Sequence, residues 1–300
     1  MLRGLAVGLL VAASVAACGS KDTPAAVRLT PTVSPTPTPT VTTPVAVPKV
    51  TPTAEPTVDR AILKLVAENG LYEAGQVPVV RCVLPRKMPR TSTEFRAYGR
   101  VIVGCMDRAW EPVIRQARGR FTPIELVQSY DLRKPSASPE CGKPPTNMDA
   151  FYRRGTICYE WPEFRNPDDP VRNLVDFQQL LAHEYGHHVQ SMATILDLYD
   201  RVYWKKPSKA VLLENERRLE LQASCLGAAF LGANRTSFGL TGERERIWTS
   251  IVHRVGDENN TLKIRDHGSY KSHAYWTTRA FASTNPATCN TFTAAPKRVS

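Results

Sequence analysis

Apolar residues recur at helical spacing through a long segment in the second half of the chain. They are Val171, Leu174, Val175, Leu181, Tyr185, Val189, Met192 and Leu196. Separations of three and four residues place such side chains along one side of an α-helix. Asp169 can cap the N-terminus of this helix, and Pro170 suits its first position. The pattern therefore predicts a long amphipathic helix that begins near residue 170 and carries its apolar stripe to Leu196.

Shorter patterns predict the other elements of the folded part. Helices are expected near residues 59–68 and from Ser92 to Arg118, and strands from Val77 to Leu84, near Ile124, and from Thr156 to Trp161. The region from Ser208 to about Ala282 reads as mostly helical and ends in a loop-like tail. Because strands come first and helices follow, the predicted class is α+β, with a small sheet packed on the long helix.

The first 58 residues lack the patterns of a folded domain. Residues 1–17 combine one arginine, a short apolar run and small residues, which is typical of a secretory signal and too short to span a bilayer permanently. The sequence VAAC, ending at Cys18, resembles the bacterial lipobox, which implies cleavage before Cys18, lipid on its sulfur and anchoring to the outer face of the cell membrane. An ordinary signal peptide with an incidental cysteine is the alternative. Residues 18–58 are rich in Thr and Pro and are predicted to be a disordered linker, which leaves one domain at 59–300.

Six further cysteines point to disulfide bonds, because an even number in an exported chain is typical of a disulfide set. Six cysteines allow fifteen connectivities, and we predict the sequential one. Its pairs are Cys82 with Cys105, Cys141 with Cys158, and Cys225 with Cys289. Zinc binding by cysteines is disfavoured, since the chain has no closely spaced CxxC pair.

The formal net charge of +11 falls to +10 once Arg3 leaves with the signal. The basic residues are spread over the segments RCVLPRKMPR, RQARGR and WKKPSK and do not form one stripe. We interpret them as a solvated surface that favours an anionic envelope. No aromatic-interleaved basic motif accompanies them, so a nucleic-acid partner is not expected.

The long helix contains the sequence HEYGH, which is an HExxH motif formed by His183, Glu184 and His187. Residues four apart share a helix face, so two imidazoles can bind one zinc ion while the intervening glutamate lies beside the metal-bound water. This geometry indicates a zinc peptidase with Glu184 as general base. The alternative is a pair of hydrogen-bonded histidines in the core of a buried helix.

A catalytic zinc site needs a third protein ligand and an open position for water. The downstream segment LLENERRLELQASCLGAAF offers Glu214, Glu216 and Glu220. Glu220 lies among apolar residues and is the most suitable to point inward, whereas Glu216 is flanked by arginines. We therefore predict Glu220 as the third ligand, with a solvated helix face as the alternative.

Four segments, HEYGHHVQ, ELQASC, HGSYKSHAYW and NPATCNTF, resemble in this order the bacterial family named "putative neutral zinc metallopeptidase". The resemblance covers roughly residues 80 to 292. It implies a zincin-like metallopeptidase domain, Zn²⁺ as cofactor and Glu220 as third ligand. It also supports the pairing of Cys225 with Cys289, since both match family cysteines.

The resemblance also implies a role for His267, which matches the histidine of the family's HGS segment. Related zinc peptidases use a histidine or tyrosine outside the metal shell to stabilise the oxyanion, so His267 is the candidate for this task. A capping or surface histidine is the alternative. His188 is expected to be structural, and His253 and His273 have no supporting context beyond helical packing.

The chain departs from the family pattern at three positions. Ser224 replaces an aspartate four residues after the ligand glutamate, where it would face the metal and orient a ligand imidazole. A serine carries no charge, and Asp266 or Glu216 could substitute for it. His273 and Asn285 replace an arginine and an aspartate of the pattern.

These features together predict a zinc-dependent peptidase at the bacterial cell surface. One alternative is a binding or scaffold lipoprotein that keeps zinc but cleaves little substrate. Ser224 favours this alternative, and the intact Glu184 disfavours it. Another is a hydrolase of cell-wall peptide cross-links. The strand from Thr156 to Trp161 is the candidate edge for pairing with a peptide substrate, although an ordinary internal strand is an equal alternative.

Overall fold

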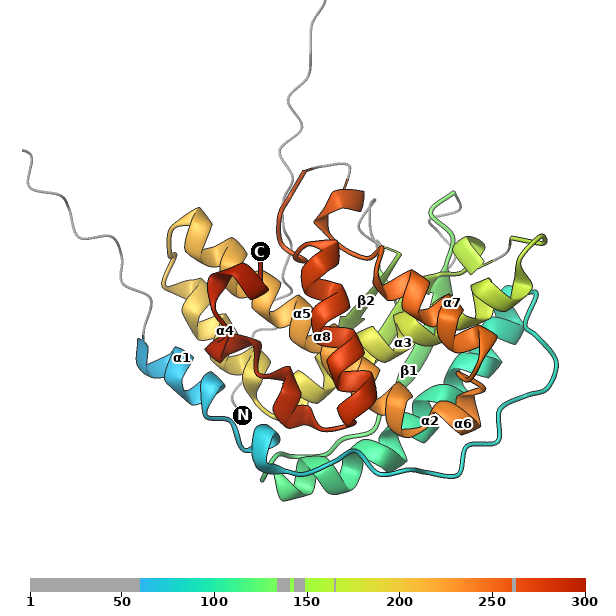
Figure 1. Ribbon diagram of the computed structural model, residues 1–300, viewed down its shortest axis with the longest axis horizontal. Helices are drawn as coiled ribbons and strands as arrows, with labels where there is room; N and C mark the ends of the chain where they lie inside the picture. Colours follow the sequence, from blue (N-terminus) through green and yellow to red (C-terminus); the bar gives the residue numbers. More distant parts are fainter. Residues whose placement is uncertain (1–59, 134–140, 143–148, 165, 261–262) are drawn as a thin grey trace, which may run out of the picture. The chain divides into compact units, whose positions relative to one another are not determined.

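The computed structural model describes residues 60–133, 141–142, 149–164, 166–260 and 263–300 (Figure 1). The predicted signal peptide (1–17), the lipidation site Cys18 and the rest of the linker (18–58) lie outside these ranges and stay predictions. Within the described ranges, no helix combines the length and the apolar composition that a membrane crossing requires.

The described elements confirm the α+β class. The α-helices are α1 (Arg60–Ala67), α2 (Ser92–Gln116), α3 (Pro170–Met192), α4 (Ile195–Trp204), α5 (Lys209–Ala233), α6 (Arg235–Phe238), α7 (Glu243–Val252) and α8 (Tyr270–Ser283). The strands are β1 (Leu126–Tyr130), β2 (Ala150–Arg153) and β3 (Thr156–Glu160). Short 3-10 helices are η1 (Gly70–Glu73), η2 (Trp161–Phe164), η3 (Asp257–Asn259), η4 (Pro286–Cys289), η5 (Thr291–Thr293) and η6 (Pro296–Arg298). The last three replace the loop-like tail that we expected.

The three strands form one sheet in the order β1-β3-β2. Strand β1 is parallel to β3, with Leu126 opposite Thr156, and β2 is antiparallel to it, with Ala150 opposite Tyr159. The prediction that the strand from Thr156 forms an edge for substrate is therefore wrong, because both of its sides are already hydrogen-bonded. Strand β2 was not predicted, since four residues are too few to show a period.

The predicted strand from Val77 to Leu84 is also wrong. From Val79 to Leu84 more and less exposed side chains alternate, with Val79 and Val83 exposed and Cys82 buried, but no strand of the described chain pairs with this segment. Its backbone groups bond elsewhere: the Val77 N–H donates to the Thr284 carbonyl and the Val80 N–H to the Asn234 side chain. An extended segment that follows a core surface shows the same period as a strand.

Helix α3 begins as predicted, with the Asp169 side chain accepting the Arg172 N–H and Pro170 in the first turn. It ends at Met192, earlier than the apolar stripe suggested. Thr194 has a left-handed backbone (φ 62°), which breaks the helix and starts α4, so Leu196 belongs to the next element.

The core surrounds α3, which contacts α2 and the sheet as well as α5. Phe177 of α3 is at the centre of an aromatic cluster with Phe95 of α2, Tyr159 of β3 and Phe164 of η2, at ring distances of 4.9–5.1 Å. Helix α5 packs in turn against α8 (Figure 1). Helix α3 is thereby held between the sheet and α5, with its central turns buried.

Helices α3 and α5 cross at direct backbone contact. A Cβ added to Gly186 of α3 would lie 2.2 Å from the Ala223 carbonyl oxygen, and one added to Gly227 of α5 would lie 2.4 Å from that of Ala182. Real Cβ atoms are not found so close to other heavy atoms, so only glycine fits at these two positions. The close approach brings short side chains of one helix within hydrogen-bond distance of the other.

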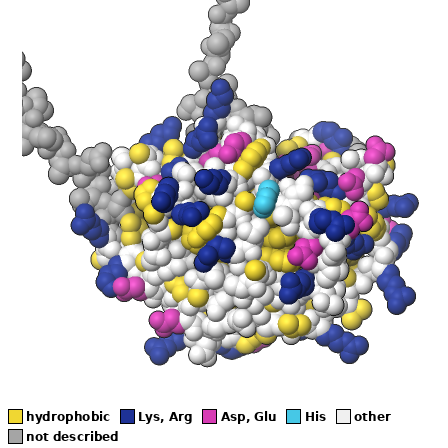
Figure 2. Space-filling view, in the orientation of Figure 1, with side chains coloured by type: hydrophobic (Ala, Val, Ile, Leu, Met, Phe, Trp, Pro, Cys, Tyr) yellow, Lys and Arg dark blue, Asp and Glu magenta, His cyan; other side chains and the backbone are white. Residues whose placement is uncertain are grey.

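The structure contains the three disulfides in the predicted pairing. Cys82 bonds to Cys105, Cys141 to Cys158, and Cys225 to Cys289. On the face drawn in Figure 2, lysines and arginines are dispersed among acidic and apolar side chains and do not gather into one stripe. This distribution agrees with a solvated basic surface.

Candidate metal centre

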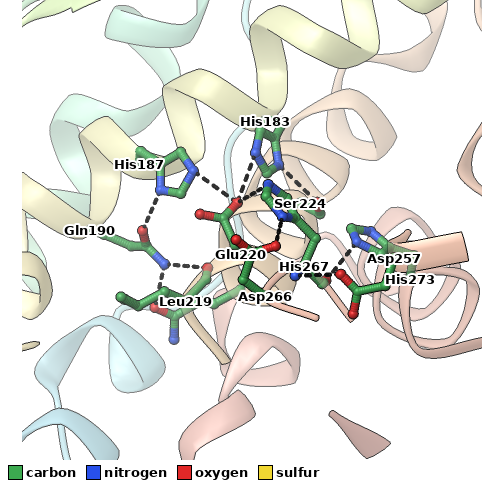
Figure 3. A network of polar contacts seen from close by, with 11 residues as sticks. His183, His187, Gln190, Leu219, Glu220, Ser224, Asp257, Asp266, His267 and His273 are labelled. Atoms are coloured by element: carbon green, nitrogen blue, oxygen red, sulfur yellow. Dashed lines mark hydrogen bonds and ion pairs between the residues drawn. The ribbon is translucent and has the colours of Figure 1, made fainter. Parts of the chain in front are cut away.

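Three side chains from α3 and α5 converge on one point. The Nε2 atoms of His183 and His187 each lie 3.3 Å from Oε2 of Glu220 (Figure 3). His183 and His187 are one helical turn apart, so their rings share a face of α3. Glu220 reaches them from α5 across the close crossing of the two helices.

The arrangement fits a zinc ion. Two ligand atoms bound tetrahedrally at about 2.0 Å lie about 3.3 Å from each other, which matches the observed separations between the imidazole nitrogens and the carboxylate. The potential ligand atoms of His183, His187 and Glu220 all lie within 4.8 Å of one another. Two imidazoles and one carboxylate form an established catalytic donor set for zinc. These three residues could therefore hold the metal and leave a coordination position open.

Glu220 and the histidines around it attract each other electrostatically. Although burial opposes ionisation, His187 and His267 hold the pKa of the Glu220 carboxyl well below its usual range. Burial likewise opposes the charged imidazole of His187, but Glu220 raises its pKa to about 9. Metal ligands must be deprotonated, so protons and a metal would compete for this site.

The outer nitrogens of both rings are also hydrogen-bonded. Nδ1 of His183 lies 2.8 Å from the Ser224 hydroxyl, and Nδ1 of His187 lies 2.9 Å from Oε1 of Gln190. Such partners fix the orientation of a ring so that Nε2 faces the metal position. The structure thus places Ser224 against the candidate ligand His183 and Gln190 against the candidate ligand His187, and the sequence did not reveal the contact of Gln190.

Glu184 is almost fully buried, with 4% of its surface exposed, on the helix that carries both histidines. Burial raises the pKa of its carboxyl, while the adjacent imidazoles of His183 and His187 lower it. A raised pKa brings a carboxylate closer to the range in which it can both accept and return a proton.

His267 lies on the open side of the centre, in the loop before α8. Its Nε2 is 3.7 Å from Oε2 of Glu220, and its side chain is 43% exposed. Its Nδ1 is 2.6 Å from the Asp266 carboxylate. Burial opposes the charged ring, but Glu220 and Asp266 together raise the pKa of His267 to about 9. A raised pKa favours the protonated ring, so His267 can act as a cationic hydrogen-bond donor toward Glu220.

The loop that presents His267 is fixed from several sides. Both oxygens of Asp257 accept main-chain N–H groups, from His267 at 3.0 Å and from Gly268 at 2.9 Å. The buried His273 of α8 donates from Nε2 to the His267 carbonyl at 2.9 Å, and burial lowers its pKa to about 3, so it stays neutral. Gly268 has φ +86°, a left-handed backbone that glycine adopts without strain. His273 thus has a structural task that the sequence did not indicate.

The other candidate residues lie apart from the metal position or serve the fold. Glu214 forms an ion pair with Arg218 at 2.7 Å, which removes it as a ligand. Asp266 bonds to His267, so it does not replace the charge missing at Ser224. His188 donates to the Thr122 carbonyl at 2.7 Å and contacts the Tyr152 hydroxyl at 3.0 Å, which is a structural role. Asn285 caps η4 by accepting the Ala287 N–H.

The second acidic alternative, Glu216, lies one turn before Glu220 on α5. Burial, Asp266 and Glu220 raise the pKa of its carboxyl to about 7. In the described part of the chain the partner of His183 Nδ1 is Ser224 and that of His187 Nδ1 is Gln190. Glu216 therefore borders the centre without replacing the aspartate of the family pattern.

The α+β fold, the two histidines of the HExxH helix α3 and the glutamate that reaches them from α5 define a zincin-like metallopeptidase domain. A family model described as "Putative neutral zinc metallopeptidase" matches residues 81–292, and the chain belongs to this family. The chain is 24% identical over 229 residues to "Uncharacterized protein YpfJ" of Escherichia coli K12, covering 72% of this chain and 77% of the relative. The protein of the same name from Escherichia coli O6:H1 matches equally. No solved structure matches the chain significantly.

Proposed function

We propose that the protein is a zinc-dependent peptidase in which His183, His187 and Glu220 hold the metal. The observation that carries this proposal is the convergence of both Nε2 atoms on one Glu220 oxygen at 3.3 Å, with Glu184 buried beside them. Zinc, when bound there, supplies Lewis acidity that polarises a peptide carbonyl and lowers the pKa of water. The residues of the chain supply the remaining chemistry.

Glu184 acts as the general base and acid. Its carboxylate accepts a proton from the attacking water and returns it to the amine that leaves when the peptide bond breaks. The raised pKa of this buried carboxyl supports the second half of the cycle, because a stronger base holds the proton until the amine takes it.

His267 stabilises the negative charge that develops on the carbonyl oxygen. Its Nε2–H points toward the metal position, while the Asp266 carboxylate at Nδ1 keeps the ring oriented and protonated. The exposed face of His267 places this donor where a substrate enters. Asp266 acts through His267 and is a positioning residue.

Our proposal for the location, and for the class of substrate available there, rests on the sequence. The signal-like residues 1–17, the lipobox-like Cys18 and the linker to residue 58 support a lipoprotein displayed on the outer face of a bacterial membrane. Three disulfides agree with an oxidising compartment. The substrates available there are peptides and proteins of the envelope, including the cross-linking peptides of the cell wall.

The decisive experiment replaces Glu184 by glutamine. Glu184→Gln keeps the size of the side chain and the three ligands, so the protein should still bind about one equivalent of zinc. Digestion of a broad peptide library should fall to background, since one general base contributes roughly 10²- to 10⁴-fold. Glu111→Gln, at a surface carboxylate paired with Arg115, is the matched control and should cut the library like the wild type. Undiminished cleavage by Glu184→Gln would exclude the mechanism.

The rival function is a zinc-binding scaffold of the envelope with little turnover. The uncharged Ser224 beside His183 favours it, because a carboxylate partner makes a ligand imidazole more basic. Wild-type protein with stoichiometric zinc, no cleavage of the library and a binding activity that Glu184→Gln leaves unchanged would establish the scaffold instead.

A further inference from the structure

A chain of buried side chains runs from the metal centre into the core, starting at His187. Gln190 and Gln222 have no exposed surface. Oε1 of Gln190 lies 2.9 Å from His187 Nδ1 (Figure 3). Nε2 of Gln190 donates to Oε1 of Gln222 at 3.0 Å. Nε2 of Gln222 donates in turn to the Tyr72 hydroxyl at 2.7 Å. We call this chain from Gln190 through Gln222 to Tyr72 the amide relay.

Main-chain carbonyls fix the direction of the relay. Nε2 of Gln190 also donates to the Leu219 carbonyl at 2.8 Å, and Nε2 of Gln222 to the Cys289 carbonyl at 3.2 Å. Because a carbonyl only accepts, each amide must turn its nitrogen toward it and its oxygen toward the next donor. Oε1 of Gln190 must therefore accept, so His187 carries a proton on Nδ1 and leaves Nε2 for the metal.

We propose that Gln190, Gln222 and Tyr72 are positioning residues that hold His187 in the metal-binding tautomer and orientation. The inference rests on the proposed zinc site and concerns how this chain maintains it. The partner of His183 is a single serine on the neighbouring helix. The partner of His187 is connected through the relay to η1, near the start of the described chain, and to η4, near its end.

The structure explains why the amide relay should affect the zinc affinity of the site. All donors and acceptors of the relay from His187 to Gln222 are paired, and the two amides lie where water does not reach them. Removing one acceptor leaves the imidazole N–H unpaired in the core and frees the ring to rotate. Loss of such a partner typically lowers metal affinity roughly 10- to 100-fold.

The test compares Gln190→Met with Gln179→Met in the full-length protein. Gln179 is a matched control because it is a buried glutamine of the same helix whose Oε1 also accepts a ring N–H, that of Trp248 at 2.7 Å. Both variants remove one buried acceptor, so both should unfold at lower urea concentration when zinc is absent. Only Gln190→Met should raise the zinc dissociation constant, by roughly 10- to 100-fold in competition with a chromophoric chelator.

Tyr72→Phe tests the far end of the relay with a minimal change. It removes only the hydroxyl that accepts from Gln222 and should also weaken zinc binding, by less than Gln190→Met does. If Gln190→Met fails to fold, Tyr72→Phe still tests the amide relay. Zinc affinity that neither Gln190→Met nor Tyr72→Phe alters, or that Gln179→Met lowers equally, would overturn the relay while leaving the proposed peptidase intact. Wild-type protein that binds no zinc would overturn both.

Discussion

The two imidazoles of the metal centre are held by neutral acceptors, a serine hydroxyl and a glutamine amide. The carboxylate nearby, Asp266, instead bonds to His267. A carboxylate partner increases the basicity of an imidazole more than a neutral partner does, because it stabilises the positive charge on the ring. The negative charge of Asp266 therefore supports His267, the imidazole that we assign to the oxyanion. His183 and His187 are instead oriented by hydrogen bonds to neutral groups.

Substitution of Ser224 tests the neutral partner of His183. Ser224→Ala removes the acceptor at 2.8 Å from Nδ1 and should weaken zinc binding roughly 10-fold. Ser224→Asp restores the family residue and should bind zinc more tightly than the wild type at pH 7, provided that its unfolding midpoint shows that the larger side chain fits. Chelator competition measures both constants. Equal affinities for wild type and Ser224→Ala would show that the hydroxyl contributes nothing to the site.

Asp176, two turns before His183 on α3, predicts a pH dependence of stability. Burial and the nearby carboxylates Asp149 and Glu163 raise its pKa from 3.8 to about 6, against the attraction of Arg172. The folded state thus binds the proton more tightly than the unfolded state, so this group stabilises the fold fully below pH 4. That contribution is lost as the pH rises through 6.

Asp176→Asn should therefore be more stable than the wild type at pH 8, by up to about 3 kcal/mol, since each pKa unit corresponds to about 1.4 kcal/mol. The gain should shrink between pH 6 and pH 4 and disappear below. Urea unfolding at several pH values measures it, with a chelator present so that acid release of zinc does not contribute. A gain that is the same at pH 4 and pH 8 would contradict the assignment.

At the scale of elements, the sequence predicted what depends on local period and caps. Helix α2 starts with a capping box between Thr91 and Glu94, and α3 starts with Asp169 and Pro170, so the sequence indicates where both helices begin. The extended segment from Val77 was mistaken for a strand, because period alone does not show whether a partner exists. The sequence also predicted the three candidate ligands, His183, His187 and Glu220, which the structure brings together. It did not predict Gln190 and Gln222, since a buried amide and a solvated one look the same in sequence.

The crossing of α3 and α5 depends on two glycines and provides a prediction at this scale. In Gly186→Ala the added Cβ would lie 2.2 Å from the Ala223 carbonyl, so the helices must separate. Glu220 would then move away from His183 and His187. We expect zinc binding to weaken by at least 10-fold, together with a fall in stability of about 1–3 kcal/mol, as for other overpacked cores.

Gly104→Ala is the control for this substitution. Gly104 lies within α2, and its Cβ would meet only the Arg108 side chain, at 3.8 Å. Alanine favours helix, so this variant should gain up to about 1 kcal/mol of stability and bind zinc normally. Chemical unfolding and chelator competition on both variants separate the effects. Normal zinc affinity in Gly186→Ala would mean that the crossing can relax without moving the ligands.

At the scale of the whole described domain, distant segments meet around the site. The candidate ligands come from α3 and α5, and His267 comes from the loop before α8. That loop is fastened by residues 299 and 300: the main-chain oxygen of Ser300 accepts from the Ser269 N–H at 2.9 Å and from the Ser272 hydroxyl at 2.8 Å. The Val299 carbonyl accepts from Arg217 of α5 at 2.7 Å. The position of His267 thus depends on residues 299 and 300, which come after helix α8 in the sequence.

Deletion of Ser300 should separate zinc binding from catalysis. It removes the acceptor of Ser269 and Ser272 but leaves the buried Val299 and all three ligands in place. Zinc affinity should stay within about twofold of wild type, while kcat on a cleaved peptide should fall roughly 10-fold or more, because small displacements of a catalytic group are costly. If the deletion acts through His267, it should lower kcat little further in a His267→Ala background, since effects that share one group are not additive. Full additivity would show that this end of the chain supports the fold and leaves the position of His267 unchanged.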